Sequence, residues 1–139
     1  MRQSQERLAF ETPGRGFVEI TREVAAVVAA AGIRDGLATV FCRHTSASLL
    51  IQENADPDVR RDLETFFARI APEGDGRYIH DAEGPDDMPA HIRAALTATT
   101  LGIPVSGARP VLGAWQGIYL YEHRRAPHRR EVVVHVIGD

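Results

Sequence analysis

Residues 44–54, HTSASLLIQEN, are the part of the sequence whose residue types best suit a ligand-binding site. Thr45, Ser46, Ser48 and Asn54 are short polar side chains of different chemistry, whereas a strand that only fills a sheet alternates apolar and polar residues. Such a mixture can line the wall of a site for a ligand with several oxygens. The alternative is a strand end and turn whose hydroxyls satisfy backbone groups.

Histidines offer a second kind of chemistry. Among six in the chain, His44 follows a predicted strand, His80 lies in a long acidic loop, and His91 begins a short predicted helix. Neutral imidazoles at such positions can bind a divalent metal, with a carboxylate or water completing the coordination. His80 and His91 are too far apart in sequence to form an HExxH helix motif. A metal site and ordinary hydrogen-bonded histidines therefore both remain open.

Carboxylates form the third group of candidates. Glu53 and Glu122 each end a predicted strand, where apolar neighbours can bury part of the side chain and shift its pKa. Asp86 and Asp87 could supply oxygen ligands to Mg²⁺ beside a substrate phosphate. For Glu122 the alternative is a surface ion pair with the arginines that follow it.

Residues 113–117, GAWQG, could deliver an aromatic face and an amide to one place, because flanking glycines allow a tight backbone path. The alternative is that Trp115, the lone tryptophan, packs in the core and Gln116 only follows it. The sequence contains no GxGxxG, P-loop, GxSxG or CxxC motif, so the common nucleotide-binding and triad signatures are absent.

The composition of the chain bears on its number of domains and on the kinds of partner it can bind. A chain of 139 residues with 44% hydrophobic content predicts one domain with its own core. With 16 Lys and Arg against 19 Asp and Glu, the formal charge of −3 predicts neither a nucleic-acid nor a membrane partner. The single cysteine, Cys42, excludes an internal disulfide and is expected to be buried, which suits a reducing cytoplasm. No signal peptide or membrane-spanning run is evident.

Apolar spacing predicts both strands and helices. Strands are predicted over 6–12, 36–43, 48–53, 118–123 and 130–137. Helices are predicted over 22–31, with Thr21 as the N-cap, and over 57–70 and 88–96. The helix over 57–70, capped by Asp56, should bury the face formed by Val59, Leu63, Phe66, Phe67 and Ile70. Residues 71–87 form a polar loop long enough to suggest a function. Because helices do not alternate with strands, the expected fold class is α+β with a mainly antiparallel sheet.

Four strings of the sequence, in this order, point to one family: HTSASLLIQENADPDVRRDLE, YIHDAEGPDDMPAHIRAAL, IPVSGARPVLGAWQGIYLYEHR and RREVVVHVIGD. Together they resemble the YjbQ family, also called UPF0047 or secondary thiamine-phosphate synthase enzymes. The resemblance implies a single YjbQ-like domain over residues 1–139, with an antiparallel β-sandwich and two to three helices. It also implies a homotrimer with polar sites near the subunit boundaries.

The family motifs also assign roles to residues of this chain. The resemblance implies a divalent metal, zinc or magnesium, held by His44, His80 and His91. It implies substrate contacts from Thr45, Ser46, Ser48, Asn54, Asp86, Asp87, Trp115 and Gln116. It implies catalytic roles for Glu53 and Glu122. Two positions depart from the family pattern: Ala114 replaces the usual Thr of GTWQG, and His135 stands where Thr is common, which leaves open whether a fourth imidazole approaches the site.

The activity that the resemblance implies is thiamine-phosphate synthesis, in which the thiazole nitrogen displaces pyrophosphate from hydroxymethylpyrimidine diphosphate. A divalent cation and polar donors would stabilise the leaving pyrophosphate. Near the motifs the sequence shows no dense group of basic residues beyond Arg43, Arg77 and Arg93, whereas a pyrophosphate site needs concentrated positive charge or a metal. The alternative is a trimeric metal- or small-ligand-binding protein without turnover, and the sequence does not decide between the two.

Overall fold

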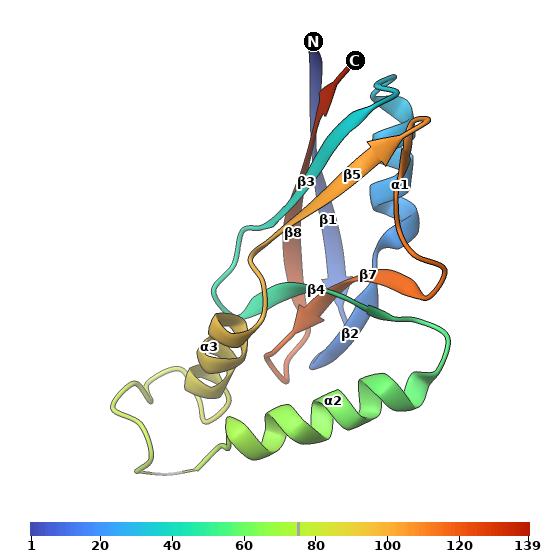
Figure 1. Ribbon diagram of the computed structural model, residues 1–139. Helices are drawn as coiled ribbons and strands as arrows, with labels where there is room; N and C mark the ends of the chain where they lie inside the picture. The colour runs from blue at the N-terminus through green and yellow to red at the C-terminus, as the bar shows by residue number, and fades with distance from the viewer. Residues whose placement is uncertain (75) are drawn as a thin grey trace.

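The computed structural model describes residues 1–74 and 76–139, and within them the chain forms two antiparallel sheets and three helices (Figure 1). The strands are β1 (Arg2–Thr12), β2 (Gly16–Glu19), β3 (Gly36–Cys42), β4 (Ala47–Glu53), β5 (Thr100–Ser106), β6 (Arg109–Pro110), β7 (Gln116–Glu122) and β8 (His128–Gly138). The helices are α1 (Thr21–Ala30), α2 (Pro57–Ile70) and α3 (Asp87–Leu96). The larger sheet has the order β1-β8-β3-β5-β6 and the smaller sheet the order β2-β7-β4. The predicted α+β class is confirmed.

The core lies on the inner face of the larger sheet. Alternate residues of β8, namely Val132, Val134 and Val136, are fully buried there, as the apolar alternation of this strand predicts. β1 pairs with β8 along its whole length, from Arg2 opposite Gly138 to Thr12 opposite His128. This long pairing places the two chain ends side by side (Figure 1).

Helix α1 covers part of this core with a stripe of valines, Val24, Val27 and Val28. Thr21, a candidate cap at the sequence level, is instead the first residue of the helix, and Ile20 holds the cap position. The Thr21 hydroxyl accepts a hydrogen bond of 2.8 Å from the backbone N–H of Ile118. The start of α1 is therefore tied to β7.

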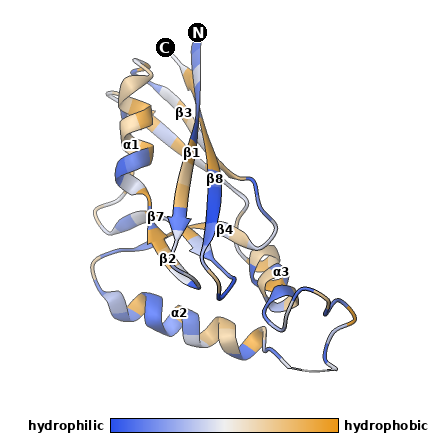
Figure 2. Cartoon of the chain, turned by 180° about the vertical axis from the view of Figure 1, so that it is seen from behind, coloured by the Kyte–Doolittle hydropathy of each residue, from blue (hydrophilic) through white to orange (hydrophobic). Residues whose placement is uncertain are grey.

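Helix α2 begins as predicted, with Pro57 in its first turn and the Asp56 carboxylate accepting a hydrogen bond from the backbone N–H of Asp58 at 2.9 Å. The predicted buried face is wrong in part. Within the described chain, Phe66 is 49% exposed and Ile70 is 42% exposed. Figure 2 shows that α2 is mostly hydrophilic and that its hydrophobic residues gather toward the end nearest α3.

The polar loop that follows α2 leads into α3, which carries candidate site residues in its first turns. Asp87 opens the helix and His91 lies one turn later, so both side chains occupy the same helix face. Asp75 of this loop lies outside the described residues. Three strands, β2, β5 and β6, were not predicted from the sequence. No helix in the described part of the chain is long and apolar enough to cross a membrane.

Candidate functional site

The described residues contain a convergent group of metal-binding side chains formed by His80, Asp87 and His91. One ligand atom from each lies within 4.8 Å of the other two. The Asp87 Oδ2 atom is 2.6 Å from His80 Nε2 and 3.2 Å from His91 Nε2. The nearly buried Asp87 carboxylate thus lies between two imidazoles. We call these three residues the HDH cluster.

Neighbouring groups fix the orientation of the cluster. His91 Nδ1 donates a hydrogen bond of 2.8 Å to the carbonyl oxygen of Thr45, which leaves the lone pair of Nε2 directed at the other ligands. A hydrogen bond to Asp87 raises the pKa of His80 above its ordinary value. Two imidazole nitrogens and one carboxylate oxygen match the protein ligands of many zinc sites that keep an open position. The donor set therefore fits zinc better than magnesium, which prefers oxygen ligands.

Arg124 holds the acidic side of the cluster in place. Its Nη1 donates to Asp87 Oδ1 at 2.8 Å, and its Nε donates to Asp86 Oδ2 at 3.0 Å. Burial alone would raise the pKa of Asp86, but the Arg125 backbone N–H and Arg124 outweigh it and hold that pKa at about 2. Asp86 is thus an ionised structural anchor for Arg124, and Arg124 orients Asp87.

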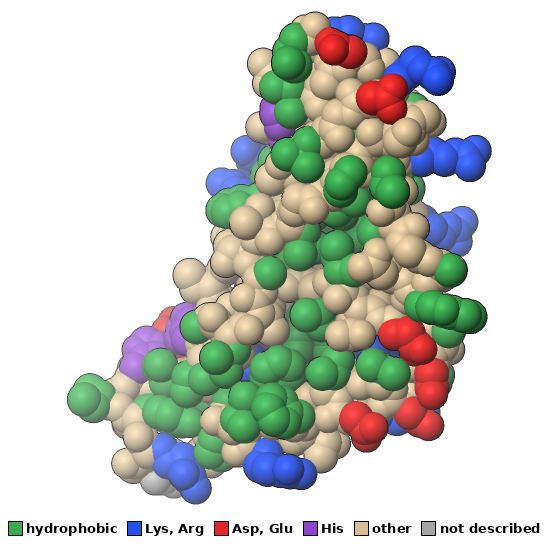
Figure 3. Space-filling model, viewed as in Figure 1, with side chains coloured by type: hydrophobic (Ala, Val, Ile, Leu, Met, Phe, Trp, Pro, Cys, Tyr) green, Lys and Arg blue, Asp and Glu red, His purple; other side chains and the backbone are tan. Residues whose placement is uncertain are grey.

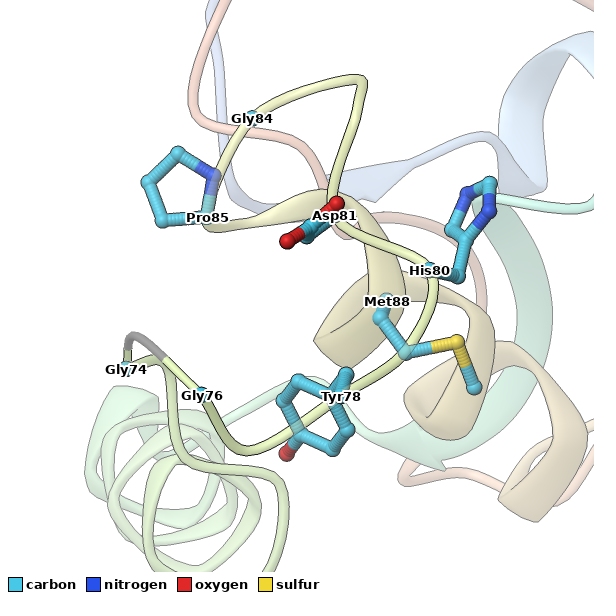
Figure 4. Close-up of a pocket in the computed structure, with 8 residues that line it drawn as sticks. All are labelled: Gly74, Gly76, Tyr78, His80, Asp81, Gly84, Pro85 and Met88. Atoms are coloured by element: carbon cyan, nitrogen blue, oxygen red, sulfur yellow. The ribbon is translucent and has the colours of Figure 1, made fainter.

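A cavity of about 310 Å³ lies beside the cluster and shares His80 with it. In Figure 4 the carboxylate of Asp81 points into the hollow enclosed by the loop, whereas the imidazole of His80 is turned away from it. Gly74, Gly76 and Gly84 form part of the lining, where the backbone itself can approach a bound molecule. The cavity is large enough for a small organic ligand next to the metal-binding atoms.

His44, the third metal ligand expected from the family motifs, is not part of this group. Its Nε2 accepts a hydrogen bond of 2.7 Å from the backbone N–H of Glu131 on β8. The third ligand atom of the cluster comes from the Asp87 carboxylate, although the resemblance implied that Asp87 contacts the substrate. His135 is also elsewhere, bonded to Gln3 at 2.8 Å.

The residues expected to contact substrate fall at two ends of the β4–β7 ladder. At one end, the Thr45 carbonyl accepts the hydrogen bond from His91, the Ser46 hydroxyl accepts one from Arg130 at 3.0 Å, and Ala47 pairs with Glu122. At the other end, Glu53 pairs with Gln116. Six residues of strand separate the ends, about 20 Å at the usual rise per residue.

At the far end, the candidate side chains make mainly local contacts. Glu53 accepts a hydrogen bond from the Asp56 backbone N–H at 2.9 Å, and Gln116 accepts one from the Gly113 backbone N–H at 2.8 Å. Asn54 donates to Glu19 at 3.3 Å. Trp115 is 65% exposed, so its alternative interpretation as a core residue is wrong. An exposed indole beside these polar groups remains available for contact with a ligand or another chain.

Glu122 is fully buried, so its alternative interpretation as a surface ion pair is wrong. Its carboxylate accepts hydrogen bonds from the Thr12 hydroxyl at 2.7 Å, from Nε and Nη2 of Arg130, and from the Arg124 backbone N–H at 3.1 Å. Burial alone would raise the pKa of Glu122, but the hydrogen bonds from Arg130 and Thr12 outweigh it and lower that pKa. This geometry favours a structural role over the catalytic role expected from sequence.

Ser48 and His123 form a buried pair beneath α3. The Ser48 hydroxyl lies 2.7 Å from His123 Nε2, and both residues are almost completely buried. Burial, reinforced by the charge of Arg93, lowers the pKa of His123 to about 3. Arg93 itself bonds Glu64 of α2 at 3.0 Å, and the Tyr121 hydroxyl of β7 donates to the same carboxylate, so these contacts fasten α3 to α2 and β7.

Because His123 is neutral in the folded protein but titrates near its ordinary pKa of 6.5 when unfolded, acid must destabilise the fold. The contribution of neutral His123 to the free energy of unfolding is fully present above pH 6.5 and is lost as the pH falls toward 3. We expect the free energy of unfolding in urea to fall by about 2 kcal/mol more between pH 7 and pH 4.5 in the wild type than in His123→Gln. His135→Gln is the control and should retain the wild-type slope; equal slopes for all three proteins would contradict this assignment.

The sequence analysis missed Thr12, Arg130 and His123 as buried partners of the site, and it considered Arg124 only as a surface partner of Glu122. Arg124 and His123 immediately follow Glu122 in the sequence, which is the one signal that could have marked them. The pairing of Thr12 with Glu122 depends on contacts across 110 positions and has no local signature.

The fold and the HDH cluster define a class: small antiparallel α+β proteins with a two-histidine, one-aspartate group at the start of a helix. The family model described as "UPF0047 protein YjbQ-like" matches residues 6–139. A UPF0047 protein of Synechocystis is 56% identical over 138 residues, covering 99% of this chain and 94% of the relative. YjbQ of Escherichia coli is 41% identical over 136 residues, covering 97% of this chain and 98% of that relative. The chain belongs to the YjbQ/UPF0047 family.

Solved structures agree with this assignment. A crystal structure of an uncharacterized YjbQ/UPF0047 protein from Clostridium acetobutylicum has a TM-score of 0.87 at 38% identity, covering 95% of this chain and 99% of that one. A conserved hypothetical protein from Thermus thermophilus has a TM-score of 0.84 at 37% identity, covering 95% of this chain and 99% of that one. The family fold therefore extends over nearly the whole chain.

Proposed function

We propose that this protein is a metal-assisted enzyme of the secondary thiamine-phosphate synthase kind, with its metal held by the HDH cluster. The observation that carries the proposal is the convergence of His80, Asp87 and His91 beside a cavity of about 310 Å³. The reaction forms a bond between the thiazole nitrogen and the methylene carbon of hydroxymethylpyrimidine diphosphate, and breaks the bond from that carbon to the diphosphate oxygen. Diphosphate leaves with the electron pair.

The residues of the chain support this chemistry in distinct ways. A bound divalent cation would supply charge stabilisation to the leaving diphosphate. Arg124 holds the carboxylate of Asp87 toward the imidazoles, and the Thr45 carbonyl holds His91 in the tautomer that offers Nε2. The loop that encloses the cavity can hold the two substrates close to each other and limit their access to water.

Turnover with defined precursors tests the proposal. Purified protein, stripped of metal and resupplied with zinc or magnesium, should form thiamine phosphate and pyrophosphate from the two phosphorylated precursors, and His91→Ala should not. The matched control is His128→Ala, which removes a histidine outside the HDH cluster. Metal binding without product formation would reject the enzyme and leave a metal- or small-ligand-binding protein.

We also propose that the chain assembles as a homotrimer. Apolar side chains are exposed on α2 and at the end of α3: Phe66 by 49%, Ile70 by 42% and Leu96 by 57%. Figure 3 shows hydrophobic side chains crowded over the lower part of this face, where these helices lie. Large exposed apolar patches commonly mark interfaces. A trimer with shared sites could also join the two separated ends of the β4–β7 ladder across a subunit boundary.

Light scattering at micromolar concentration should give a mass about three times the 15.3 kDa of the chain. Replacing both Phe66 and Ile70 by Glu should reduce the mass to that of one chain, because charges cannot be buried unpaired in an apolar interface. Replacing the exposed Val111 by Glu should leave the trimer intact. A wild-type mass equal to that of one chain would reject the assembly.

A further inference from the structure

A second group of side chains, next to Thr45 and outside the HDH cluster, has the chemistry of an anion site. A cavity of about 340 Å³ is lined by Phe41, Cys42, Arg43, His44, Thr45 and Thr99. Thr45 connects the two regions, since its carbonyl accepts the hydrogen bond from His91. The cavity therefore borders the HDH cluster without sharing any of its proposed metal ligands.

His44 contributes a hydrogen-bond donor of fixed identity. Its Nε2 accepts the backbone N–H of Glu131, so the proton of the neutral ring must be on Nδ1. Burial, with a further contribution from the charge of Arg130, lowers the pKa of His44 below its ordinary value. The ring thus stays neutral and its remaining polar atom is an N–H donor.

Three arginines gather around Glu131, the residue whose backbone N–H bonds His44. The carboxylate of Glu131 is shared by three arginines: Arg43 at 2.9 Å, Arg129 at 3.3 Å and Arg7 at 3.6 Å. Three guanidinium groups around one carboxylate give this group of four a net charge of +2. The side chains of the three arginines are 43%, 61% and 63% exposed, so their donors are accessible from solvent.

These arginines come from different strands and meet only in the folded chain. Arg7 lies on β1, Arg129 on β8, and Arg43 follows β3, and these strands are neighbours in the larger sheet. The concentration of positive charge that the sequence lacked near the family motifs is therefore supplied by the strand order. Guanidinium groups, a neutral imidazole N–H and threonine hydroxyls are all donors suited to phosphate oxygens.

We propose that Arg43 and His44, with Arg7 and Arg129 beside them, bind the phosphate or diphosphate group of a small-molecule ligand. The modest cavity and the overall charge of −3 favour a small phosphate ester over a nucleic acid. The proposal adds a binding site for the substrate's phosphate groups to the proposed function. Only the identity of the reaction rests on that proposed function. It places the anionic group of the substrate next to the metal cluster, in a separate set of donors.

Calorimetry with pyrophosphate as the probe, in the presence of a chelator, tests the site independently of metal and turnover. We expect measurable binding by the wild type, and at least a tenfold loss of affinity in Arg43→Gln. Arg61→Gln, which removes an exposed arginine of α2, should bind as the wild type does. The double variant His80→Ala, His91→Ala should also retain binding. Equal affinity in wild type and Arg43→Gln, or loss of binding in the double variant, would overturn the proposal.

Nuclear magnetic resonance of the ¹⁵N-labelled imidazoles gives a second readout. His44 should show a protonated Nδ1 and an unprotonated Nε2, and pyrophosphate should shift its Nδ1–H resonance. A single-stranded oligonucleotide should produce no comparable shift. A His44 resonance that pyrophosphate leaves unchanged would overturn the proposal, as would a stronger response to the oligonucleotide. If thiamine phosphate formation fails while the pyrophosphate shift is present, the anion site stands and only the reaction is rejected.

Discussion

Replacing Glu122 by Gln is expected to lower the free energy of unfolding by about 3 kcal/mol, because it leaves the charge of Arg130 buried without its partner. Gln has nearly the same size as Glu, so the loss measures charge pairing and hydrogen bonding more than packing. Urea unfolding at pH 7, monitored by circular dichroism, would measure the change.

Asp58→Asn is the matched control for this experiment. Asp58 also pairs with an arginine, Arg61 at 2.8 Å, but both side chains are more than two-thirds exposed. Its replacement should change stability by less than about 0.5 kcal/mol. Should Glu122→Gln keep wild-type stability and lose only turnover, the structural role assigned here to Glu122 would be wrong and the catalytic role favoured.

Replacing His80 and His91 together by Ala is expected to remove the bound metal, from about one zinc per chain to near zero. The reason is that two of the three converging ligand atoms are lost, leaving only the Asp87 carboxylate. Elemental analysis after dialysis against zinc would measure the stoichiometry.

The control for the metal experiment is His44→Ala. Within the described residues His44 is not part of the HDH cluster, so this variant should keep its zinc. An unchanged zinc content in the double variant would exclude the cluster as the metal site. Loss of zinc in His44→Ala would instead restore His44 as a ligand, supplied within the chain or from a neighbouring subunit.

The sequence predicted the main strands because burial on one face imposes a two-residue period, which β8 shows through Val132, Val134 and Val136. It also predicted the start of α2 from Asp56 and Pro57, whose capping chemistry is local. The exposure of Phe66 and Ile70 was not predictable in the same way. An apolar helical stripe shows that a face avoids water, and it does not distinguish the chain's own core from another subunit.

The site was predictable only where its geometry is local. Asp87 and His91 are one helical turn apart in α3, so the helix brings them together, but the predicted helix began one residue too late to include Asp87. His44 was expected beside His80 and His91, but its ring accepts a hydrogen bond from the backbone N–H of Glu131, which is 87 positions away in the sequence. The arginines around Glu131 were equally hidden, because only the pairing of β1 and β3 with β8 brings Arg7, Arg43 and Arg129 together.

The central claim, a divalent metal held by the HDH cluster, is tested most directly by anomalous diffraction from a crystal grown with zinc. Data recorded on either side of the zinc absorption edge should show one strong peak per chain, about 2.0–2.2 Å from His80 Nε2, Asp87 Oδ2 and His91 Nε2. A crystal with no peak at these atoms, or with its peak at His44 and away from Asp87, would contradict the claim.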